Sequence, residues 1–349
     1  MTDHPTSSKN ATSGRGVSGQ RGVSRRALLA GAGTAAAGVA GLAWYGGSEG
    51  GWRAETAILR APRYDASLPR RLREGLKSLG IDRQAVHRKR ILLKPNLVEP
   101  SREAPHINTH PLFVRSVAEV FLQLDAAEVI VGEGQGHIRD SWYVLEQSGL
   151  QSQLDDTKLS FIDLNVDRVF TAKNAGGRMK ERKLYLPQTL RRVDWIVSLP
   201  KMKTHHWAGA TLAMKNLFGV MPGICYGWPK NVLHFNGIPQ SIYDINATVR
   251  PHLAIVDGIV GMEGDGPIMG TPKAAGVIVM GRNFPAVDAT CCRLMQIDPR
   301  RVPYLRLSSG RLGPILERHI EQRGESIAAC AKPFATLPDS GLLPETSPI

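Results

Sequence analysis

One stretch of the chain, residues 90–134, decides the fold class. It reads RILLKPNLVEPSREAPHINTHPLFVRSVAEVFLQLDAAEVIVGEG. The apolar runs at 90–93 and 128–131 predict buried strands, and residues 112–124 between them have the spacing of an amphipathic helix. A strand, a helix and a second strand in this order are typical of a parallel sheet with a covering helix.

The same alternation extends outward from this stretch. Further strands are predicted at 56–59, 158–162, 194–198, 253–256 and 276–280, and further helices at 68–79, 238–249 and 285–295. The pattern predicts an α/β fold with a largely parallel or mixed central sheet and helices on both faces. We expect a single domain over residues 54–332 and a loose, Pro- and Ser-rich tail over residues 333–349.

Residues 1–53 are expected to form a disordered leader with an export signal. Arg25 and Arg26 precede residues 27–45, which carry no charge and are rich in Ala and Gly. Paired arginines before a weakly apolar segment are typical of twin-arginine export. We therefore expect a periplasmic or cell-envelope protein with the twin-arginine machinery as a partner. The sequence leaves open whether the leader is cleaved or residues 27–45 remain as a membrane anchor.

Charge and cysteine content narrow the class of ligand. The formal net charge is +13, but the basic residues are scattered, so we expect an anionic small molecule rather than nucleic acid as a partner. A solvated basic surface is the plainer alternative. The four cysteines, Cys225, Cys291, Cys292 and Cys330, form no C-x-x-C pair, so no iron–sulfur cluster is expected. The identity of any other cofactor or metal stays open.

Polar side chains follow the two strands of the opening stretch. Lys94 and Asn96 come directly after the first strand, and Glu133 follows the second. Because ligands of α/β folds gather at the carboxyl ends of the strands, these residues are candidates for a binding site. A surface turn formed by Pro95 is the alternative explanation for the first two.

The densest group of reactive side chains follows the strand predicted at 194–198. Residues 198–206 read SLPKMKTHH and residues 211–219 read TLAMKNLFG. Crowded lysines lower one another's pKa, which favours an anionic ligand or a neutral reactive amine. A solvated basic loop fits poorly, because apolar residues such as Met202 and Trp207 are interleaved with the lysines.

Two further groups lie in the second half of the chain. Asp257 follows the strand at 253–256, and Glu263 comes a few residues later, so both carboxylates could act as acid or base or bind a divalent cation. Plain glycine turns are the alternative. His234 lies in a long loop and is either a site residue or a surface residue.

Several of these segments together resemble one known family. The pieces PKMKTH at 200–205, KNLFG at 215–219 and EGDGP at 263–267, with the residues named above, are similar to the family called domain of unknown function 362 over roughly residues 54–310. The resemblance implies that these positions form one site, but it implies no reaction. Some members carry ferredoxin-like cysteine clusters that this chain lacks, so it implies no iron–sulfur centre here.

Our hypothesis is an enzyme that acts on an anionic small molecule in a pocket rich in Lys, His, Asn and Asp. The alternatives are a non-catalytic anion- or metal-binding protein and a redox accessory protein. The expected catalytic residues are His205, His234, Asp257, Glu263 and Glu133. The expected ligand-binding residues are Lys94, Asn96, Lys201, Lys203, Thr211, Lys215 and Asn216.

Overall fold

The computed structural model describes residues 51–136, 140–157 and 159–342. They belong to one compact unit of the chain, Ser48–Ile349. The predicted leader, with its paired arginines, lies outside the described residues. Among the described helices, none combines the length and the apolar character needed to span a bilayer.

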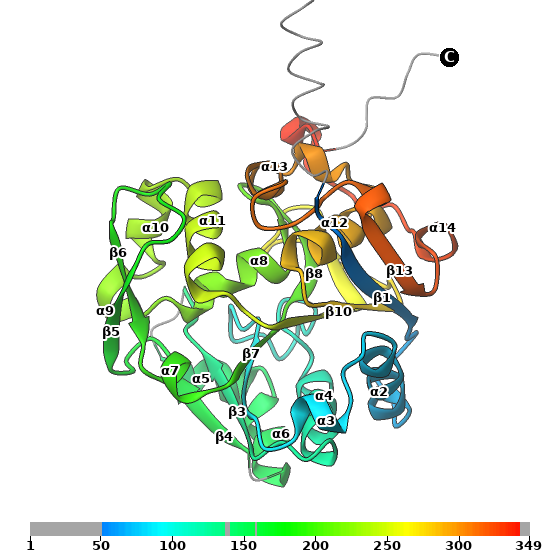
Figure 1. Ribbon diagram of the computed structural model, residues 1–349, viewed down its shortest axis with the longest axis horizontal. Helices are drawn as coiled ribbons and strands as arrows, with labels where there is room; N and C mark the ends of the chain where they lie inside the picture. Colours follow the sequence, from blue (N-terminus) through cyan, green and yellow to red (C-terminus); the bar gives the residue numbers. More distant parts are fainter. Residues whose placement is uncertain (1–50, 137–139, 158, 343–349) are drawn as a thin grey trace, which may run out of the picture. The chain divides into compact units, whose positions relative to one another are not determined.

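A mixed sheet of eleven described strands runs through the unit (Figure 1). Along the main path of the sheet, neighbouring strands are parallel except around β12, which runs antiparallel to both β1 and β10. The predicted mixed sheet is therefore confirmed. Its main path is β13 (Ile320–Gly324), β1 (Ala54–Arg60), β12 (Val277–Gly281), β10 (Leu253–Glu263), β7 (Trp195–Leu199), β2 (Arg90–Pro95), β3 (Glu128–Glu133) and β4 (Ser160–Asp163).

Three short strands lie off this path, and a separate hairpin completes the strands. Of the three, β8 (Lys201–His205) and β11 (Thr271–Lys273) pair with β10, while β9 (Gly209–Thr211) pairs with β8. The hairpin consists of β5 (Val169–Lys173) and β6 (Lys183–Pro187). The sequence had predicted neither this hairpin nor β8.

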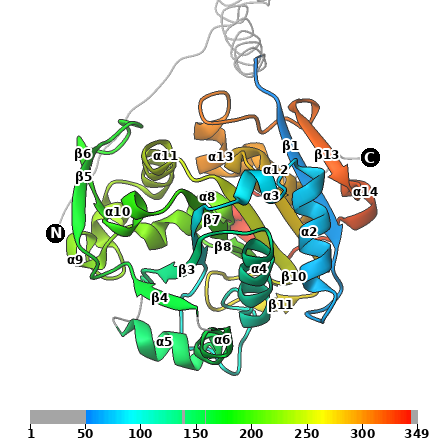
Figure 2. The same cartoon turned by 60° about the horizontal axis from the view of Figure 1, so that its bottom comes forward.

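Helices cover both faces of the sheet, as predicted (Figure 2). On one face lie α2 (Leu68–Ser78), α3 (Arg83–Val86), α4 (Pro111–Gln123), α5 (Ser141–Gln147) and α6 (Leu150–Thr157). On the other lie α8 (Ala213–Asn216), α11 (Ile238–Val249), α12 (Phe284–Leu294) and α13 (Pro303–Ser308). The remaining short helices are α7 (Thr189–Arg192), α9 (Gly223–Tyr226), α10 (Asn231–Phe235), α14 (Ile327–Cys330), η1 (Leu217–Val220), η2 (Pro299–Arg301), η3 (Glu317–His319) and η4 (Pro338–Ser340).

The two-sided arrangement follows from the side-chain alternation of the strands. In β12, Val277 and Val279 belong to the core under α11 and α12, whereas Ile278 and Met280 belong to the core under α2 and α4. Successive side chains of a strand point to opposite faces, so a continuous apolar run needs cover on both sides. The apolar runs that predicted these strands therefore also required two helical layers.

The C-terminal segment is the part of the domain plan that needs correction. A loose tail was expected from residue 333, but Phe334 and Leu342 are buried in the core, and Gly264 N donates a hydrogen bond to Ala335 O at 2.8 Å. The expectation is wrong for residues 333–342 because these two apolar side chains gain from burial despite the prolines around them. Residues 343–349 lie outside the described part.

Candidate functional site

The site is built around β8, a strand that the sequence analysis did not predict, although it grouped these residues after the strand at 194–198. After β7 the chain turns at Pro200 and pairs again, with Lys201 opposite Asp257 and Lys203 opposite Met262 of β10. On its other edge Lys203 lies opposite Thr211 of β9. The two-residue period of a strand places Lys201, Lys203 and His205 on one face of β8. The lysines are therefore held by the sheet and are buried.

A cavity of about 290 Å³ opens in front of these strands. It lies among the carboxyl ends of β2 and β3, the strand β8, the helix α8, the helix α10 and the loop after β10. Nine of the twelve predicted site residues line it, namely Lys94, Asn96, Glu133, Lys203, His205, Thr211, Lys215, Asn216 and His234. The segments that the sequence analysis grouped from distant parts of the chain do converge.

Lys201 and Asp257 lie outside this cavity and need correction as site residues. Lys201 Nζ donates to Asp257 Oδ2 at 2.6 Å, and both side chains are fully buried. The same carboxylate accepts from His110 N at 3.0 Å and from the Tyr64 hydroxyl at 2.8 Å. Asp257 does not end its strand, because β10 continues to Glu263. The pair therefore ties β8, β10 and the start of α4 together.

Glu263 also lies outside the cavity. Its Oε2 accepts from Lys273 Nζ at 2.9 Å and from Ala335 N at 2.9 Å, so it anchors β11 and the C-terminal segment. A divalent cation held by Asp257 and Glu263 was one expectation. In residues 51–136, 140–157 and 159–342, no three His, Cys, Asp or Glu side chains are grouped closely enough to hold a metal.

The floor of the cavity is an ion pair braced by an amide. Lys94 Nζ donates to Glu133 Oε2 at 2.7 Å and to Asn216 Oδ1 at 3.0 Å. Asn216 Nδ2 in turn donates to Lys94 O and to Ser198 Oγ, both at 3.0 Å. Glu133 accepts two backbone N–H groups besides, from Leu97 and Gly134. Both carboxylate oxygens are thus occupied, which makes Glu133 the counter-charge of Lys94 rather than a free base.

Three further lysines reach the cavity without a carboxylate partner in the described part of the chain. Lys203 Nζ donates to the carbonyls of Ile107 at 2.8 Å and Pro267 at 3.1 Å. Lys215 Nζ lies 3.9 Å from the centre of the Phe218 ring. A surplus of positive charge in a largely buried space favours an anion.

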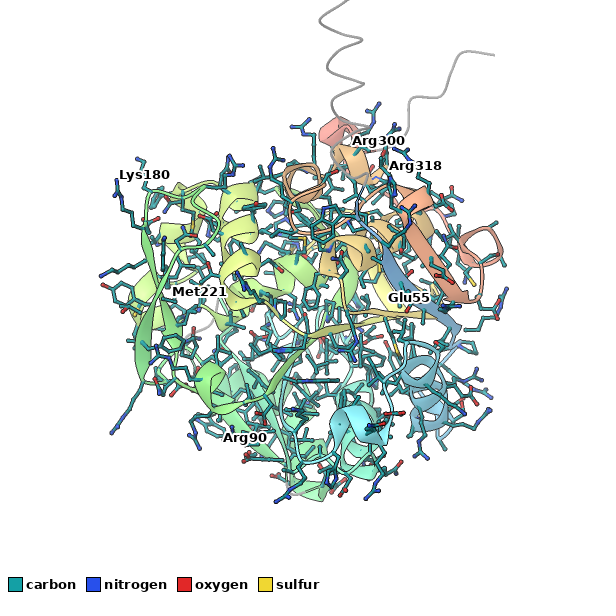
Figure 3. The ribbon with its side chains drawn as sticks, in the orientation of Figure 1. Glu55, Arg90, Lys180, Met221, Arg300 and Arg318 are labelled. Carbon is teal, nitrogen blue, oxygen red and sulfur yellow. The ribbon has the colours of Figure 1, made fainter. Side chains whose placement is uncertain are left out.

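Lys230 is the third of these lysines, and the sequence analysis missed it. It is buried, and its Nζ donates to Asn165 Oδ1 and to the carbonyl of Met221, a residue labelled in Figure 3. Its backbone lies in the left-handed region, with φ of 67°, just before α10. The sequence shows it only as a lysine in a loop, and no spacing rule links it to the other lysines.

Burial changes the protonation of these amines. Desolvation, joined by repulsion from Lys94, lowers the pKa of Lys215 to about 7. Desolvation also lowers the pKa of Lys230 to about 7. The pKa of Lys203 falls well below its usual value, mainly because of burial and then because of the neighbouring lysines. An anion in the cavity would reverse part of this effect by favouring the charged amines.

Of the three histidines that line the cavity, His205 and His234 are held in opposite tautomers by the backbone. His205 Nδ1 accepts from the N–H groups of Trp207 at 3.1 Å and Ala208 at 3.2 Å, so its proton is on Nε2. His234 Nδ1 faces the carbonyl of Lys230 at 3.0 Å, to which it donates, so its Nε2 carries a lone pair. Burial lowers the pKa of His205 to about 2 and also lowers that of His234. His205 is therefore a fixed donor, and His234 is the better base.

Two buried polar atoms of the cavity lining lack partners among the described residues. They are Asn96 Oδ1 and Thr211 Oγ1, from side chains that are 8% and 4% exposed. A buried polar group without a hydrogen bond is costly, so such groups mark places where a ligand or a water molecule binds. Both residues were predicted as ligand contacts.

The walls and the mouth of the cavity are apolar. Leu97, Val98, Phe218 and Ile268 line it, and Trp207 and Met269 lie at the rim with exposed fractions of 67% and 78%. Apolar walls around fixed charges suit an organic anion with a carbon skeleton.

Asp288 positions the helix that carries Lys215 and Asn216. Its two carboxylate oxygens accept from Ala213 N at 2.7 Å and Met214 N at 3.1 Å, at the first turn of α8. Tyr304 donates to the same carboxylate at 3.1 Å. Asp288 itself belongs to α12, so it fixes a helix other than its own.

The fold and the site define an α/β protein with one basic, partly apolar cavity at strand ends. Residues 91–293 match the model of the family Domain of unknown function (DUF362), and the chain belongs to this family. The resemblance drawn from the motifs is thus confirmed.

The chain is also similar to individual known proteins, at low sequence identity. The thylakoid-associated protein sll1697 of Synechocystis sp. is 28% identical over 263 residues, which cover 74% of this chain and 79% of that protein. A crystal structure from Thermotoga maritima matches at 14% identity with a TM-score of 0.39, over 67% of this chain and 59% of the other. The lactate racemase apoprotein of Thermoanaerobacterium thermosaccharolyticum matches at 11% identity with a TM-score of 0.41, over 71% and 58%.

Proposed function

We propose that the protein is an enzyme that acts on a small organic anion bound in this cavity. The observation that carries the proposal is the meeting of Lys203, Lys215 and Lys230 in one cavity without carboxylate partners among the described residues. Lys94, by contrast, is neutralised by Glu133. A bound anion would supply the negative counter-charge that no carboxylate provides to these three lysines.

Proton transfer is the chemistry that the lining residues support best. Lys215 has a pKa of about 7, so both of its protonation states are populated near neutral pH. His234 offers a neutral ring nitrogen on the same cavity. An acid and a base that face the same bound anion can carry out general acid–base catalysis. His205 would contribute a hydrogen bond instead of a proton, because its pKa is about 2.

Binding and turnover are tested separately. A panel of small carboxylates and phosphates is titrated calorimetrically into the purified protein, and bound probes are followed for chemical change. We expect Lys203→Met and Lys215→Met each to weaken anion binding at least tenfold, because each removes one of the few cations that face the ligand. Lys77→Met is the matched control, since Lys77 lies on α2 and is not among the cavity residues. Unchanged binding in both cavity variants would refute the proposal.

A non-catalytic binding protein is the alternative, favoured by the carbonyl groups that already hold Lys203. It predicts a probe or a co-purified anion that stays chemically intact during long incubation with the protein. Turnover that Lys215→Met and His234→Phe abolish would decide for the enzyme.

We also propose export by the twin-arginine route. The paired Arg25 and Arg26 carry this proposal. Changing both to Lys should retain the protein in the cytoplasm, as measured by cell fractionation. Unchanged export of that variant would contradict it.

A further inference from the structure

The lining of the cavity allows a statement about the chemical class of the ligand, which rests on the proposed function. A bound molecule must supply acceptors to the donors of the lining and donors to its acceptors. The lysines and His205 Nε2 are donors, so they are satisfied by any anion. The remaining polar groups of the lining need a hydrogen-bond donor from the ligand as well.

Besides Asn96 Oδ1, which lacks a partner among the described residues, His234 is a group of the lining that needs a hydrogen-bond donor. Its Nδ1 is held by the carbonyl of Lys230, which can only accept, so the ring proton lies on Nδ1. The Nε2 lone pair has no partner among the described residues, and the ring lines the cavity. A simple carboxylate has no proton to offer this nitrogen at neutral pH, because it is ionised.

His205 supplies the matching donor. Its Nδ1 accepts two backbone N–H groups, so its Nε2 carries the proton. The two histidines are linked through a row of ring contacts, in which Trp207 lies 6.0 Å from His234 and 4.6 Å from His206, and His206 lies 5.0 Å from His205. The same cavity thus offers one fixed imidazole donor and one fixed imidazole acceptor.

Thr211, which lies opposite Lys203 in the pairing of β8 and β9, also needs a hydrogen-bond partner from the ligand. Its hydroxyl is buried, has no partner among the described residues, and can both donate and accept. An ammonium group on the ligand would satisfy His234 and Thr211, but it would be placed among Lys203, Lys215 and Lys230 and would be repelled.

We propose that the cavity binds an organic anion that carries a hydroxyl group, with the anionic group on the lysines and the hydroxyl between His205 and His234. The hydroxyl oxygen accepts from His205 Nε2–H, and its proton is donated to His234 Nε2. The apolar lining from Leu97, Val98 and Phe218 receives the carbon skeleton. Carboxylates and phosphates share this chemistry, and the experiment separates them.

The test uses probes that differ only in the hydroxyl group. Glycolate is compared with acetate, and 2-hydroxyethyl phosphate with ethyl phosphate, by calorimetric titration into the full-length protein. In the pair of probes that binds, we expect the hydroxylated probe to bind about tenfold more tightly than the deoxy probe. The reason is that the deoxy probe leaves His234 Nε2 without a hydrogen-bond donor. Glycine, which carries an ammonium group, should bind no better than acetate. Equal affinities within both pairs would overturn the inference but leave the proposed anion site intact, whereas no binding in any arm would refute both.

Variants test whether His234 is the residue that recognises the hydroxyl group. His234→Phe keeps a ring of similar size but has no lone pair, so the preference for the hydroxylated probe should vanish. The control is His87→Phe, because His87 pairs with Asp125 and is not among the cavity residues. A preference that survives His234→Phe would contradict the assignment.

Nitrogen NMR of the unmodified protein provides a test that does not depend on a variant. We expect the Nε2–H tautomer for His205 and the Nδ1–H tautomer for His234, and a shift of the His234 Nε2 resonance when the hydroxylated probe binds. The reverse tautomers, or a shift of equal size with the deoxy probe, would overturn the inference.

Discussion

Lys94 and Glu133 form a fully buried ion pair at the carboxyl ends of two neighbouring parallel strands, with 2.7 Å between Nζ and Oε2 and 1% exposure on each side chain. The strands β2 and β3 run side by side, so residues just past their apolar runs end up adjacent. The pair lies at the base of the cavity and occupies the only carboxylate among its buried lining residues in the described chain.

Glu133→Gln is expected to destabilise the fold strongly. The amide keeps the shape of the side chain but leaves Lys94 buried without a counter-charge, which costs about 3–5 kcal/mol. The free energy of unfolding in urea measures this loss. Glu74→Gln is the control, because Glu74 pairs with Arg70 at the surface, with 58% and 69% exposure, and should change the stability by less than about 1 kcal/mol. Similar losses in both variants would show that the buried pair has no special role.

Gly219→Ala should damage both stability and anion binding. A Cβ at Gly219 would collide with the Glu133 carboxylate and with Lys94 Nζ, so the ion pair would have to move. We expect a loss of about 1–3 kcal/mol in unfolding free energy and weaker binding of anionic probes. Gly51→Ala is the control, since a Cβ there meets nothing within 4 Å. Wild-type stability of Gly219→Ala would show that the pair tolerates displacement.

Raising the pH above neutral should weaken anion binding while it stabilises the empty protein. The pKa values of Lys215 and Lys230 are about 7 in the folded chain, below the ordinary value for lysine. Between pH 7 and the ordinary lysine value the unfolded chain therefore holds protons that the folded chain does not, so the free energy of unfolding rises with pH. The anion loses its charged partners over the same range.

Calorimetry and urea unfolding at pH 6, 7.5 and 9 measure the two trends. Lys215→Met should flatten both, because it removes one of the titrating amines. Binding that strengthens as the pH rises through this range would contradict the expected protonation of the cavity lysines.

Asp257→Asn should lower the stability of the fold but leave anion binding in the cavity unchanged. Asp257 holds Lys201, Tyr64 and the N-terminus of α4, and it does not line the cavity. Removing its charge leaves Lys201 buried without a counter-charge, so we expect a loss of about 3–5 kcal/mol in stability. The dissociation constant of an anionic probe, measured under conditions where the variant is folded, should stay within about twofold. A tenfold weaker affinity would show that Asp257 does contribute to anion binding.

Much of the fold could be predicted because its strands are continuous apolar runs. The runs at 90–93 and 128–131 became β2 and β3, and the helix between them became α4. The strand β8 could not be predicted in this way, because Lys201, Lys203 and His205 alternate with only one strongly apolar residue, Met202. The hairpin β5–β6 was missed since its exposed side chains alternate with half-buried ones in β5 and with buried ones in β6, over only five residues per strand.

The candidate site was predictable as a set but not in its internal roles. The rule that ligands bind at strand ends grouped Lys94, Asn96 and Glu133 correctly. The same rule failed for Asp257, because β10 continues past it to Glu263 and buries it against Lys201. Lys230 reaches the cavity from a loop, so no local pattern could reveal it.

The sequence by itself determined the α/β class, the family and the segments from which the site is made, because apolar periodicity and motif spacing are local properties of the chain. The tertiary structure decided which lysines have a carboxylate, which histidine nitrogen carries the proton, and which polar atoms lack a partner. These depend on contacts between distant segments, such as Lys94 with Glu133 and His234 with the carbonyl of Lys230. Charge and protonation in a buried site are set by such neighbours, and they exist only once the chain has folded.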